Sequence, residues 1–217
     1  MASQSNQAAE AKSSRAGRDA AATKQAILDA AEAEFSRHGL QGARISAIAK
    51  GAGVTTAMIH YYFDNKEGLY RAVLHRPALE TDAAIARLQL QDLPPEDALV
   101  AFVRAAITYE ALHPQRGMLW FQEANQNRGN YFKLTQDSWA AVQQYLLDIL
   151  ERGIAEGVFR PLNLQLTTVH ILGICIFYFN IHENWKHLVP EIDRLSSEQI
   201  DAHIDAAVAL ILAGVRA

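Results

Sequence analysis

Apolar residues recur at steps of three and four along most of the chain, which is the spacing of one face of an α-helix. Near the front, such a run follows Thr23, whose hydroxyl suits the N-cap position, and Gly39 predicts the end of this helix. Two shorter helical patterns follow, one over residues 45–51 and another from Thr55. No alternating strand pattern stands out in the sequence.

The remaining helical patterns are longer and are separated by proline and glycine. Pro77 predicts an interruption of the fourth helix. Pro95 with acidic residues behind it is typical of a helix start, and Ser196 with Gln199 indicates a capping box. Further helices are expected over 78–90, 95–112, 116–127, 131–156, 164–186 and 197–213. We therefore predict an all-α fold of about nine helices, with a seam within residues 64–77.

The composition is that of a globular protein, since 50% of the 217 residues are hydrophobic. The longest apolar run, from Ile171 to Phe179, is far shorter than the about 20 residues that cross a bilayer. The single cysteine, Cys175, excludes an intrachain disulfide and a cysteine-based zinc site. The N-terminus lacks the apolar stretch of a secretory signal. We expect a cytoplasmic protein without membrane attachment.

Charge is distributed unevenly along the chain. Residues 1–76 carry ten Lys and Arg against seven Asp and Glu, whereas residues 77–217 carry ten against seventeen. A basic front on an acidic body suits a small head that binds a polyanion. Residues 1–22 are expected to form a disordered arm, whose cations either follow a DNA minor groove or make no contact. These cations are Lys12, Arg15 and Arg18.

Residues 45–63 carry the spacing that a helix-turn-helix requires. Ala49 is small enough for a second helix to approach, and Gly53 can adopt the positive φ of a tight turn. Ile59 then fills the angle between the two helices, and Thr55 caps the second one. In this motif, the exposed N-terminal part of the second helix enters the major groove of DNA.

The four consecutive rings of residues 60–63 divide between two faces of this helix. Phe63 lies one turn after Ile59, so both are expected in the core. Tyr62 lies partly on the same face, whereas the other two rings point outwards, towards DNA. Lys66 begins the next helix, where its ammonium and the free backbone N–H groups can hold a phosphate.

Two segments, "ILDAAEAEFSRHG" and "ISAIAKGAGVTTAMIHYYFDNKEGLY", resemble the TetR/AcrR family of one-component transcriptional regulators. The resemblance covers about residues 24–72, and "YYFDNKEGLY" is its most specific part. It implies a homodimer with a DNA-reading head over 23–70 and an effector-binding body over 71–217. By position, it implies DNA contacts from Arg44, Ser46, Thr55, Thr56, Ala57, Met58, His60, Tyr61, Tyr62 and Lys66.

Two positions depart from the family's pattern. The family often has Thr or Ser before the second helix, where this chain has Arg44. That exchange removes a cap but adds a cation beside the duplex. The family commonly has Tyr at position 60, where this chain has His60, so the contact expected there is in doubt.

The helices over 164–186 and 197–213 are expected to form the dimer interface. Residues 169–185 are apolar nearly all round, which predicts burial on more than one side. An effector cavity needs apolar walls with a few polar groups. The candidate residues are Trp120, Phe121, Glu123, Asn127, Trp139, His170, Phe177, Tyr178 and Asn180.

No metal site or cofactor is expected. His170, His182 and His187 do not share one helix face, in contrast to an i, i+4 pair of ligands. The leading hypothesis is a repressor that a small apolar or aromatic effector releases from a pseudo-palindromic operator in double-stranded DNA. An activator, or a regulator that senses a partner protein, is an open alternative. An all-helical enzyme is a remote one, because no paired nucleophile and base stands out.

Overall fold

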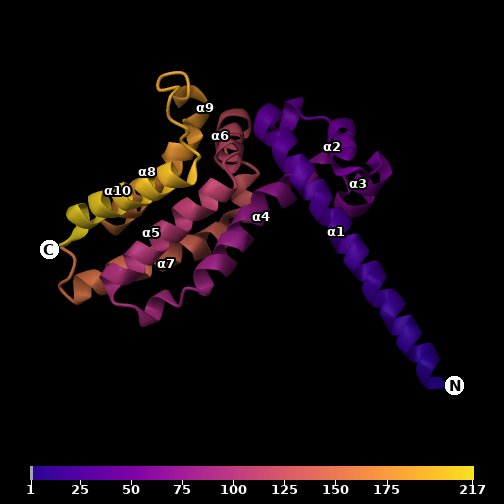
Figure 1. Cartoon of the computed structure of the whole chain (residues 1–217), viewed down its shortest axis with the longest axis horizontal. Helices are drawn as coiled ribbons and strands as arrows, with labels where there is room; N and C mark the ends of the chain where they lie inside the picture. The colour runs from indigo at the N-terminus through magenta and orange to yellow at the C-terminus, as the bar shows by residue number, and fades with distance from the viewer. Residues whose placement is uncertain (1) are drawn as a thin grey trace. The chain divides into compact units, whose positions relative to one another are not determined.

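A computed structural model describes the chain from residue 2 to residue 217, and its side chains at residue 17 and from residue 19 onward (Figure 1). Over this range the structure has ten α-helices and two short 3-10 helices, η1 and η2, and no strand, where about nine helices were expected. The elements are α1 (Ala2–Gly42), α2 (Ile45–Ala52), α3 (Thr56–Phe63), α4 (Lys66–Ala86), η1 (Leu90–Asp92), α5 (Pro95–Leu112), α6 (Arg116–Asn127), η2 (Phe132–Thr135), α7 (Gln136–Ala155), α8 (Leu164–Asn180), α9 (His182–Trp185) and α10 (Ser197–Val215).

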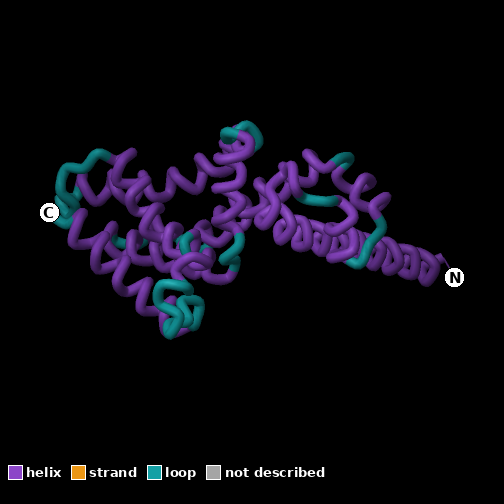
Figure 2. Tube along the Cα trace, turned by 90° about the horizontal axis from the view of Figure 1, so that it is seen from above, coloured by secondary structure: helices purple, strands orange, loops and turns teal. Residues whose placement is uncertain are grey.

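The chain divides into two compact units, Met1–Val73 and Leu74–Ala217, which we call the head and the body. In both units the helices are joined by short connections, drawn in teal in Figure 2. The functional domain boundaries expected from the sequence, after residues 22 and 70, remain predictions.

The start of the first helix differs from our expectation. Thr23 does not cap it, because the Thr23 hydroxyl donates to the carbonyl of Asp19 at 2.7 Å, as in a helix interior. Gly39 has a non-helical backbone (φ 63°, ψ −179°), and α1 continues through this kink to Gly42. The disorder expected for residues 1–22 remains a prediction, since most side chains of that segment, those of Lys12, Arg15 and Arg18 included, lie outside the described residues.

Three other boundaries were wrong. Pro77 lies inside a continuous α4, where the fixed φ of proline is compatible with a helix and only one backbone bond is lost. The single helix expected over 131–156 divides at Thr135, whose hydroxyl bonds the carbonyl of Phe132 at 2.9 Å. The helix expected over 164–186 divides into α8 and α9 at Ile181, which has φ −93° and ψ 0°.

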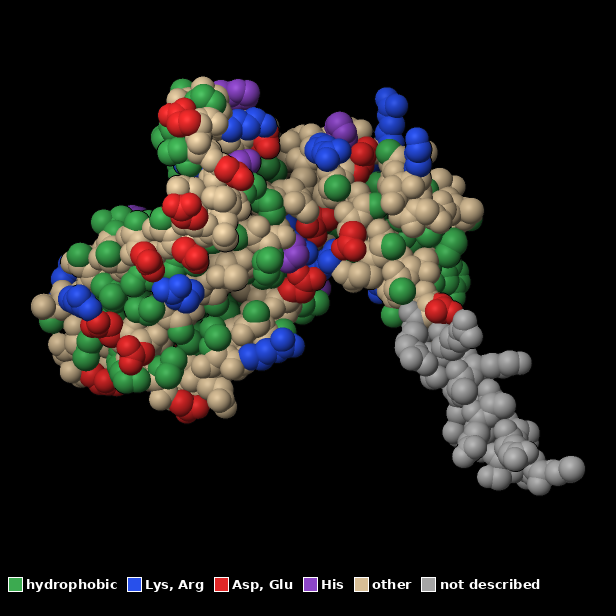
Figure 3. All heavy atoms as spheres, viewed as in Figure 1, with side chains coloured by type: hydrophobic (Ala, Val, Ile, Leu, Met, Phe, Trp, Pro, Cys, Tyr) green, Lys and Arg blue, Asp and Glu red, His purple; other side chains and the backbone are tan. Residues whose placement is uncertain are grey.

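The head packs its three first helices around a small apolar core. Phe35 of α1, Ile48 of α2 and Ile59 of α3 are buried. The rings of Phe35 and Tyr70 meet edge to face, with 4.9 Å between their centroids. On the outside of this unit, Lys and Arg side chains stand out from the surface (Figure 3).

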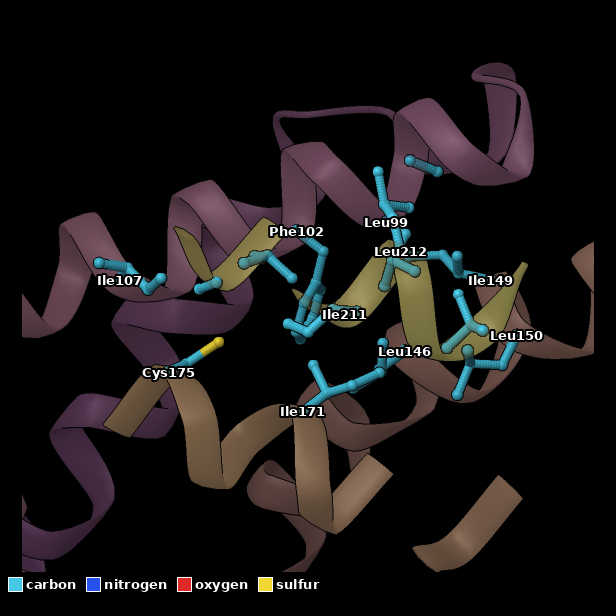
Figure 4. Packing of buried hydrophobic residues seen from close by; sticks show 14 of the residues in the cluster. Leu99, Phe102, Ile107, Leu146, Ile149, Leu150, Ile171, Cys175, Ile211 and Leu212 are labelled. Atoms are coloured by element: carbon cyan, nitrogen blue, oxygen red, sulfur yellow. The ribbon is translucent and has the colours of Figure 1, made fainter. Parts of the chain in front are cut away.

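The body has the larger core, built mainly from α5, α7, α8 and α10 (Figure 4). Phe102, Leu146, Ile171 and Ile211 supply one fully buried side chain from each of these helices. The chain end is fastened to this core by an antiparallel backbone bridge between Phe159 and Arg216. Helix α8 contributes Ile171, Cys175 and Phe179 to this core and also lines a cavity of the body.

Candidate functional site

The turn between α2 and α3 has the geometry expected of a helix-turn-helix. Gly53 has φ 65° and ψ 30°, a left-handed conformation that glycine adopts without strain. Its N–H bonds the end of α2, and the N–H of Val54 donates to the carbonyl of Ala49 at 3.0 Å. Ala49 and Ile59 are buried where the two helices meet. The expected roles of these residues in the turn are confirmed.

Arg44 precedes α2 and provides no side-chain cap, as expected. Instead, its backbone N–H donates to the Glu34 carboxylate of α1 at 3.0 Å. A carboxylate at this position satisfies one helix-terminal donor and favours the positive end of the helix dipole. The Arg44 side chain is therefore not needed for the cap, and both Arg44 and Ser46 are exposed.

The outer face of α3 is exposed while its inner face is buried. Thr55 caps the helix by accepting a hydrogen bond from the N–H of Met58 at 3.4 Å. Tyr61 is 83% exposed, and its ring lies 5.1 Å from that of Tyr62. The exposed residues of this face are Thr55, Thr56, Ala57, His60 and Tyr61, and Met58 and Tyr62 are half-buried.

Two of the expected DNA-contacting residues have local partners. The Nδ1 atom of His60 lies 2.9 Å from the carbonyl oxygen of Asp64, which helps to close the end of α3. The Lys66 ammonium donates to the carbonyl of Gln41 at 3.2 Å and so fastens the start of α4 to the end of α1. The partner of His60 is only four residues away, whereas the partner of Lys66 is 25 residues away and was not foreseeable from the local pattern. Whether these side chains also contact DNA remains a prediction.

The body contains a cavity of about 510 Å³ between helices α4, α5, α6, α7 and α8 and the short helix η2. This volume is in the range of small-molecule sites. Nearly all of its walls are apolar or aromatic, and no Lys, Arg or His is among the lining residues. Of the residues expected around an effector, it brings together Trp120, Phe121, Trp139, Phe177 and Asn180.

The other expected pocket residues lie elsewhere. The Glu123 carboxylate accepts hydrogen bonds from the N–H of Tyr131 at 2.7 Å and from the Asn127 amide at 2.7 Å, so the two residues hold the turn before η2. His170 and Tyr178 line a separate, open hollow beside α8. In that hollow, the Arg194 guanidinium lies 3.8 Å from the centre of the Tyr178 ring.

Several residues of the cavity were not predicted from the sequence. Glu110 on α5 and Thr168 on α8 face it, together with Tyr109 and Phe132. Burial raises the pKa of Glu110 to about 7, although the nearby Arg116 guanidinium acts in the opposite direction. Glu110 lies in a helix of ordinary amphipathic pattern, so the sequence does not distinguish it from other glutamates. Only its burial among other helices identifies it as a cavity residue.

Three aromatic rings form one wall of the cavity. The centroids of Trp120 and Trp139 are 4.3 Å apart, and those of Trp120 and Phe132 are 4.8 Å apart. Each ring comes from a different element, namely α6, α7 and η2. Such a wall can bind the face or edge of a planar ligand, or a cation.

A charged network lies beside this cavity. Arg116 is buried, donates to the Glu80 carboxylate at 2.6 Å and bonds the hydroxyl of Tyr109. Arg76 donates to the other Glu80 oxygen at 2.7 Å. Burial raises the pKa of Tyr109, so this phenol stays protonated. The guanidinium of Arg116 is therefore directed at Glu80 and Tyr109, and Arg116 is not a lining residue of the cavity.

The described residues provide neither a metal site nor a membrane-spanning helix. No cluster of three or more His, Cys, Asp or Glu side chains there is arranged to hold a metal ion. No helix in the same part of the chain combines the length and apolarity that a membrane crossing requires.

Comparison with known proteins relates both units to one family. A model for bacterial regulatory proteins of the tetR family matches residues 27–73, and a model for the tetracyclin repressor-like C-terminal domain matches residues 95–211. The transcriptional repressor NicS of Pseudomonas putida is 32% identical over 161 residues, which cover 72% of this chain and 75% of that protein. The repressor SCO4008 of Streptomyces coelicolor is 28% identical over 193 residues, or 88% and 91% of the two chains.

A solved structure supports the same fold. The ketosteroid transcriptional regulator KstR2 of Mycobacterium tuberculosis superposes with a TM-score of 0.70 at 20% sequence identity. The match covers 89% of this chain and 95% of that one. At this identity the likeness concerns the arrangement of helices alone.

Proposed function

The chain belongs to the TetR family of bacterial regulatory proteins, and we propose that it represses transcription from a pseudo-palindromic operator until a small molecule enters the body. It is a ligand-responsive, DNA-binding transcriptional regulator of all-α fold. A regulator of this kind acts on the chromosome, so we place it in the cytoplasm.

The observation that carries the DNA-binding part of the proposal is the two-sided character of α3. Ile59 and Phe63 anchor the helix in the head, while Thr56, Ala57 and Tyr61 face solvent. A helix that is held rigidly on one side and exposed on the other can enter a major groove without unfolding. Its first backbone N–H groups can also meet a phosphate.

We divide the DNA contacts between base edges and phosphates. Residues at the start of α3 are proposed to reach base edges, and the flanking residues are proposed to bind phosphates. Lys66 keeps two further N–H donors when one bonds Gln41, so its ammonium is held in place and still able to bind an anion. The base-edge group is Thr56, Ala57, Met58 and His60, and the phosphate group is Arg44, Ser46, Thr55, Tyr61, Tyr62 and Lys66.

Family members act as dimers, and we propose that α8 and α10 form the interface here. On α8, Leu166, Val169 and Phe177 are exposed and lie on one face of the helix. On α10, Leu210 is exposed. It lies beside a face of exposed alanines that would allow two helices to approach closely, Ala202, Ala206, Ala209 and Ala213. Two heads of one dimer would then read half-sites about 34–36 Å apart or a related distance.

The body cavity is the proposed effector site. We propose that the effector binds more tightly to a conformation of the dimer that cannot bind DNA. Effector binding then increases the population of that conformation and lowers the affinity for the operator. No catalytic role is assigned, because Glu110 and Tyr109 are the only ionisable lining residues and neither is paired with a nucleophile.

The proposal is tested on operator DNA found by footprinting genomic fragments. The double variant Arg44→Ala/Tyr61→Ala should weaken operator binding by about 10-fold or more and make binding less dependent on salt, since it removes two of the proposed phosphate contacts. The matched control Lys133→Ala/Tyr131→Phe removes one charge and one polar group from the body and should leave binding unchanged. Fluorescence anisotropy measures both. Equal affinity of the double variant and the parent protein would show that α3 is not the contact surface.

The direction of regulation needs a separate measurement. A reporter driven by the footprinted promoter should increase in a strain that lacks this protein. A decrease would instead indicate an activator. An operator complex that a partner protein dissociates, and that small molecules leave intact, would favour a partner-sensing regulator.

A further inference from the structure

Four buried polar atoms without a hydrogen-bond partner lie on residues that line the body cavity. They are Oε2 of Glu110, Nε1 of Trp139, Oγ1 of Thr168 and Oδ1 of Asn180. Buried polar groups in native proteins are almost always hydrogen-bonded, so a cluster of exceptions around one cavity points to a missing partner. A ligand bound in the cavity would supply the hydrogen-bonding groups that these four atoms lack.

The chemistry of these atoms constrains the ligand. The Glu110 carboxylate and the Asn180 carbonyl accept hydrogen bonds, Thr168 can accept or donate, and only the Trp139 N–H is purely a donor. Acceptors therefore outnumber donors, which favours a ligand rich in N–H groups. A carboxylate or phosphate ligand would bury its charge here without a counter-charge, because no Lys, Arg or His lines the cavity.

The charge of Glu110 favours a cation in the same place. Burial raises the pKa of Glu110 to about 7 against the effect of Arg116, so the carboxyl lacks the full stabilisation of an ion pair. The guanidinium of Arg116 is bonded to Glu80 at 2.6 Å and to Tyr109. Glu110 also lies near enough to Cys175, in the second half of α8, to contribute to the raised pKa of that thiol.

The aromatic wall supplies the second half of a cation site. The ring centroids of Trp120 and Trp139 are 4.3 Å apart and Phe132 packs beside both, so these three rings line the same cavity as Glu110. A positive charge is attracted to such faces, most strongly to those of tryptophan. Aromatic rings and one carboxylate together can stabilise an ammonium group that has lost its hydration shell, through cation–π attraction and an ion pair.

We propose that the cavity selects a small aromatic molecule with one protonated amine, whose ammonium binds Glu110 and whose ring packs against Trp120 and Trp139. This inference rests on the proposed function, since it names the chemical class of the effector. The distance of twelve residues between Thr168 and Asn180 along α8, about 18 Å, leaves room for an apolar extension beyond the amine.

The test uses three probes that share an indole ring and differ in charge, namely tryptamine, indole-3-ethanol and indole-3-acetate. Binding to the full-length protein is measured by thermal shift and by titration calorimetry. Tryptamine should raise the melting temperature most and bind at least about 10-fold more tightly than the neutral alcohol, and the acetate should bind most weakly.

Two variants assign the preference to one side chain. Glu110→Gln keeps the shape but not the charge, and should remove most of the preference for tryptamine over indole-3-ethanol. Glu151→Gln changes an exposed carboxylate of α7 and should leave the preference intact. Melting curves without ligand establish whether each variant is folded. If a variant does not fold, the comparison of the three probes on the parent protein still tests the proposal.

Proton linkage provides an independent readout. With a pKa of about 7, about half of the Glu110 carboxyls are protonated at pH 7, so binding a cation there releases about half a proton. Tryptamine affinity should therefore rise from pH 6 to pH 8. Of the groups near Glu110, Arg116 stays charged, and burial raises the pKa of Cys175 to about 12, so neither titrates in this window. Two histidines also lie nearby: the His113 ring is 5.1 Å from that of Tyr109, and His203 bonds the backbone of Cys175. The same pH series on Glu110→Gln therefore isolates the contribution of Glu110, and the rise in affinity should be lost in that variant.

Each other outcome overturns the proposal. Equal binding of all three probes, tighter binding of the alcohol or the acetate, or no binding of tryptamine would contradict an amine site. Operator binding is measured separately on the unliganded protein. A protein that binds its operator but does not prefer tryptamine would retain the proposed function and lose this inference. A protein that prefers tryptamine but does not bind an operator would retain the amine site and lose the proposed function.

Discussion

At the side chain of Glu80, burial and hydrogen bonding act on the pKa in opposite directions. Burial raises the pKa, whereas hydrogen bonds from Arg116 and Arg76 lower it by more, so the carboxyl has a lower pKa than its ordinary 4.5. Arg116 is only 2% exposed and therefore depends on this partner. A group whose pKa is lowered by folding stabilises the protein above its unfolded pKa, and this contribution is lost as the pH falls through the folded pKa.

We expect Glu80→Gln to lower the free energy of unfolding at pH 7 by about 2 kcal/mol, because hydrogen bonds between charged groups contribute about 1.5–3 kcal/mol. The difference between variant and parent should begin to shrink as the pH falls below about 4.5, where the unfolded chain binds the proton first, and it should be lost below the lower pKa of Glu80 in the folded chain. Urea unfolding at a series of pH values measures it. The exposed Glu191→Gln serves as control, and a pH-independent difference would contradict the ion-pair explanation.

At the scale of elements, the turn between α2 and α3 depends on one backbone conformation. Gly53 has φ 65°, and a Cβ built there would meet no atom within 4 Å. Glycine is therefore required because a residue with a Cβ would be strained in this backbone conformation, and not because its side chain would clash with a neighbour. Gly214 offers a matched contrast, because a Cβ there also meets no atom and its backbone is helical.

Gly53→Ala should lower the free energy of unfolding by about 1–2 kcal/mol, the cost of a left-handed conformation for a residue with a Cβ. Gly214→Ala should raise it by about 0.5 kcal/mol, since alanine loses less backbone freedom in a helix. Urea unfolding followed by circular dichroism distinguishes the two. Changes of the same sign would mean that the turn relaxes to another conformation.

At the scale of the whole molecule, apolar side chains on α8 and α10 remain exposed in the single chain. Leu166 of α8 is 56% exposed and Leu210 of α10 is 63% exposed, although the body already has a large core. Isolated exposed leucines are ordinary, but an apolar face continued by alanines on α10 is typical of a protein interface.

The double variant Leu166→Glu/Leu210→Glu should convert the dimer into a monomer in sedimentation experiments, because four carboxylates would be buried across the two-fold axis. Operator affinity should fall with it, since a monomer reads one half-site only. Leu134→Glu places the same charge on an equally exposed leucine of η2 (62%) and should leave the dimer intact. A dimeric double variant would locate the interface elsewhere.

The amino-acid sequence by itself determined the features that depend on near neighbours in the chain. The caps at Thr55 and Ser196, the glycine turn at Gly53 and the inward position of Ile59 all follow from contacts within a few residues. Helical periodicity and capping are local properties, so the all-α fold and the helix-turn-helix could be predicted. Pro77 was misjudged because its effect depends on whether neighbouring helices support the turn.

Only the tertiary structure decided which polar groups became chemically distinctive. Glu110 resembles other helix glutamates in the sequence, and its raised pKa arises from burial where α5 meets α6 and α8. Glu123 was assigned to the cavity, but its carboxylate is used by backbone N–H groups of residues 131 and 132. The bond of Lys66 to Gln41 likewise joins residues 25 apart. Burial and electrostatic fields depend on distant segments, which no local pattern encodes.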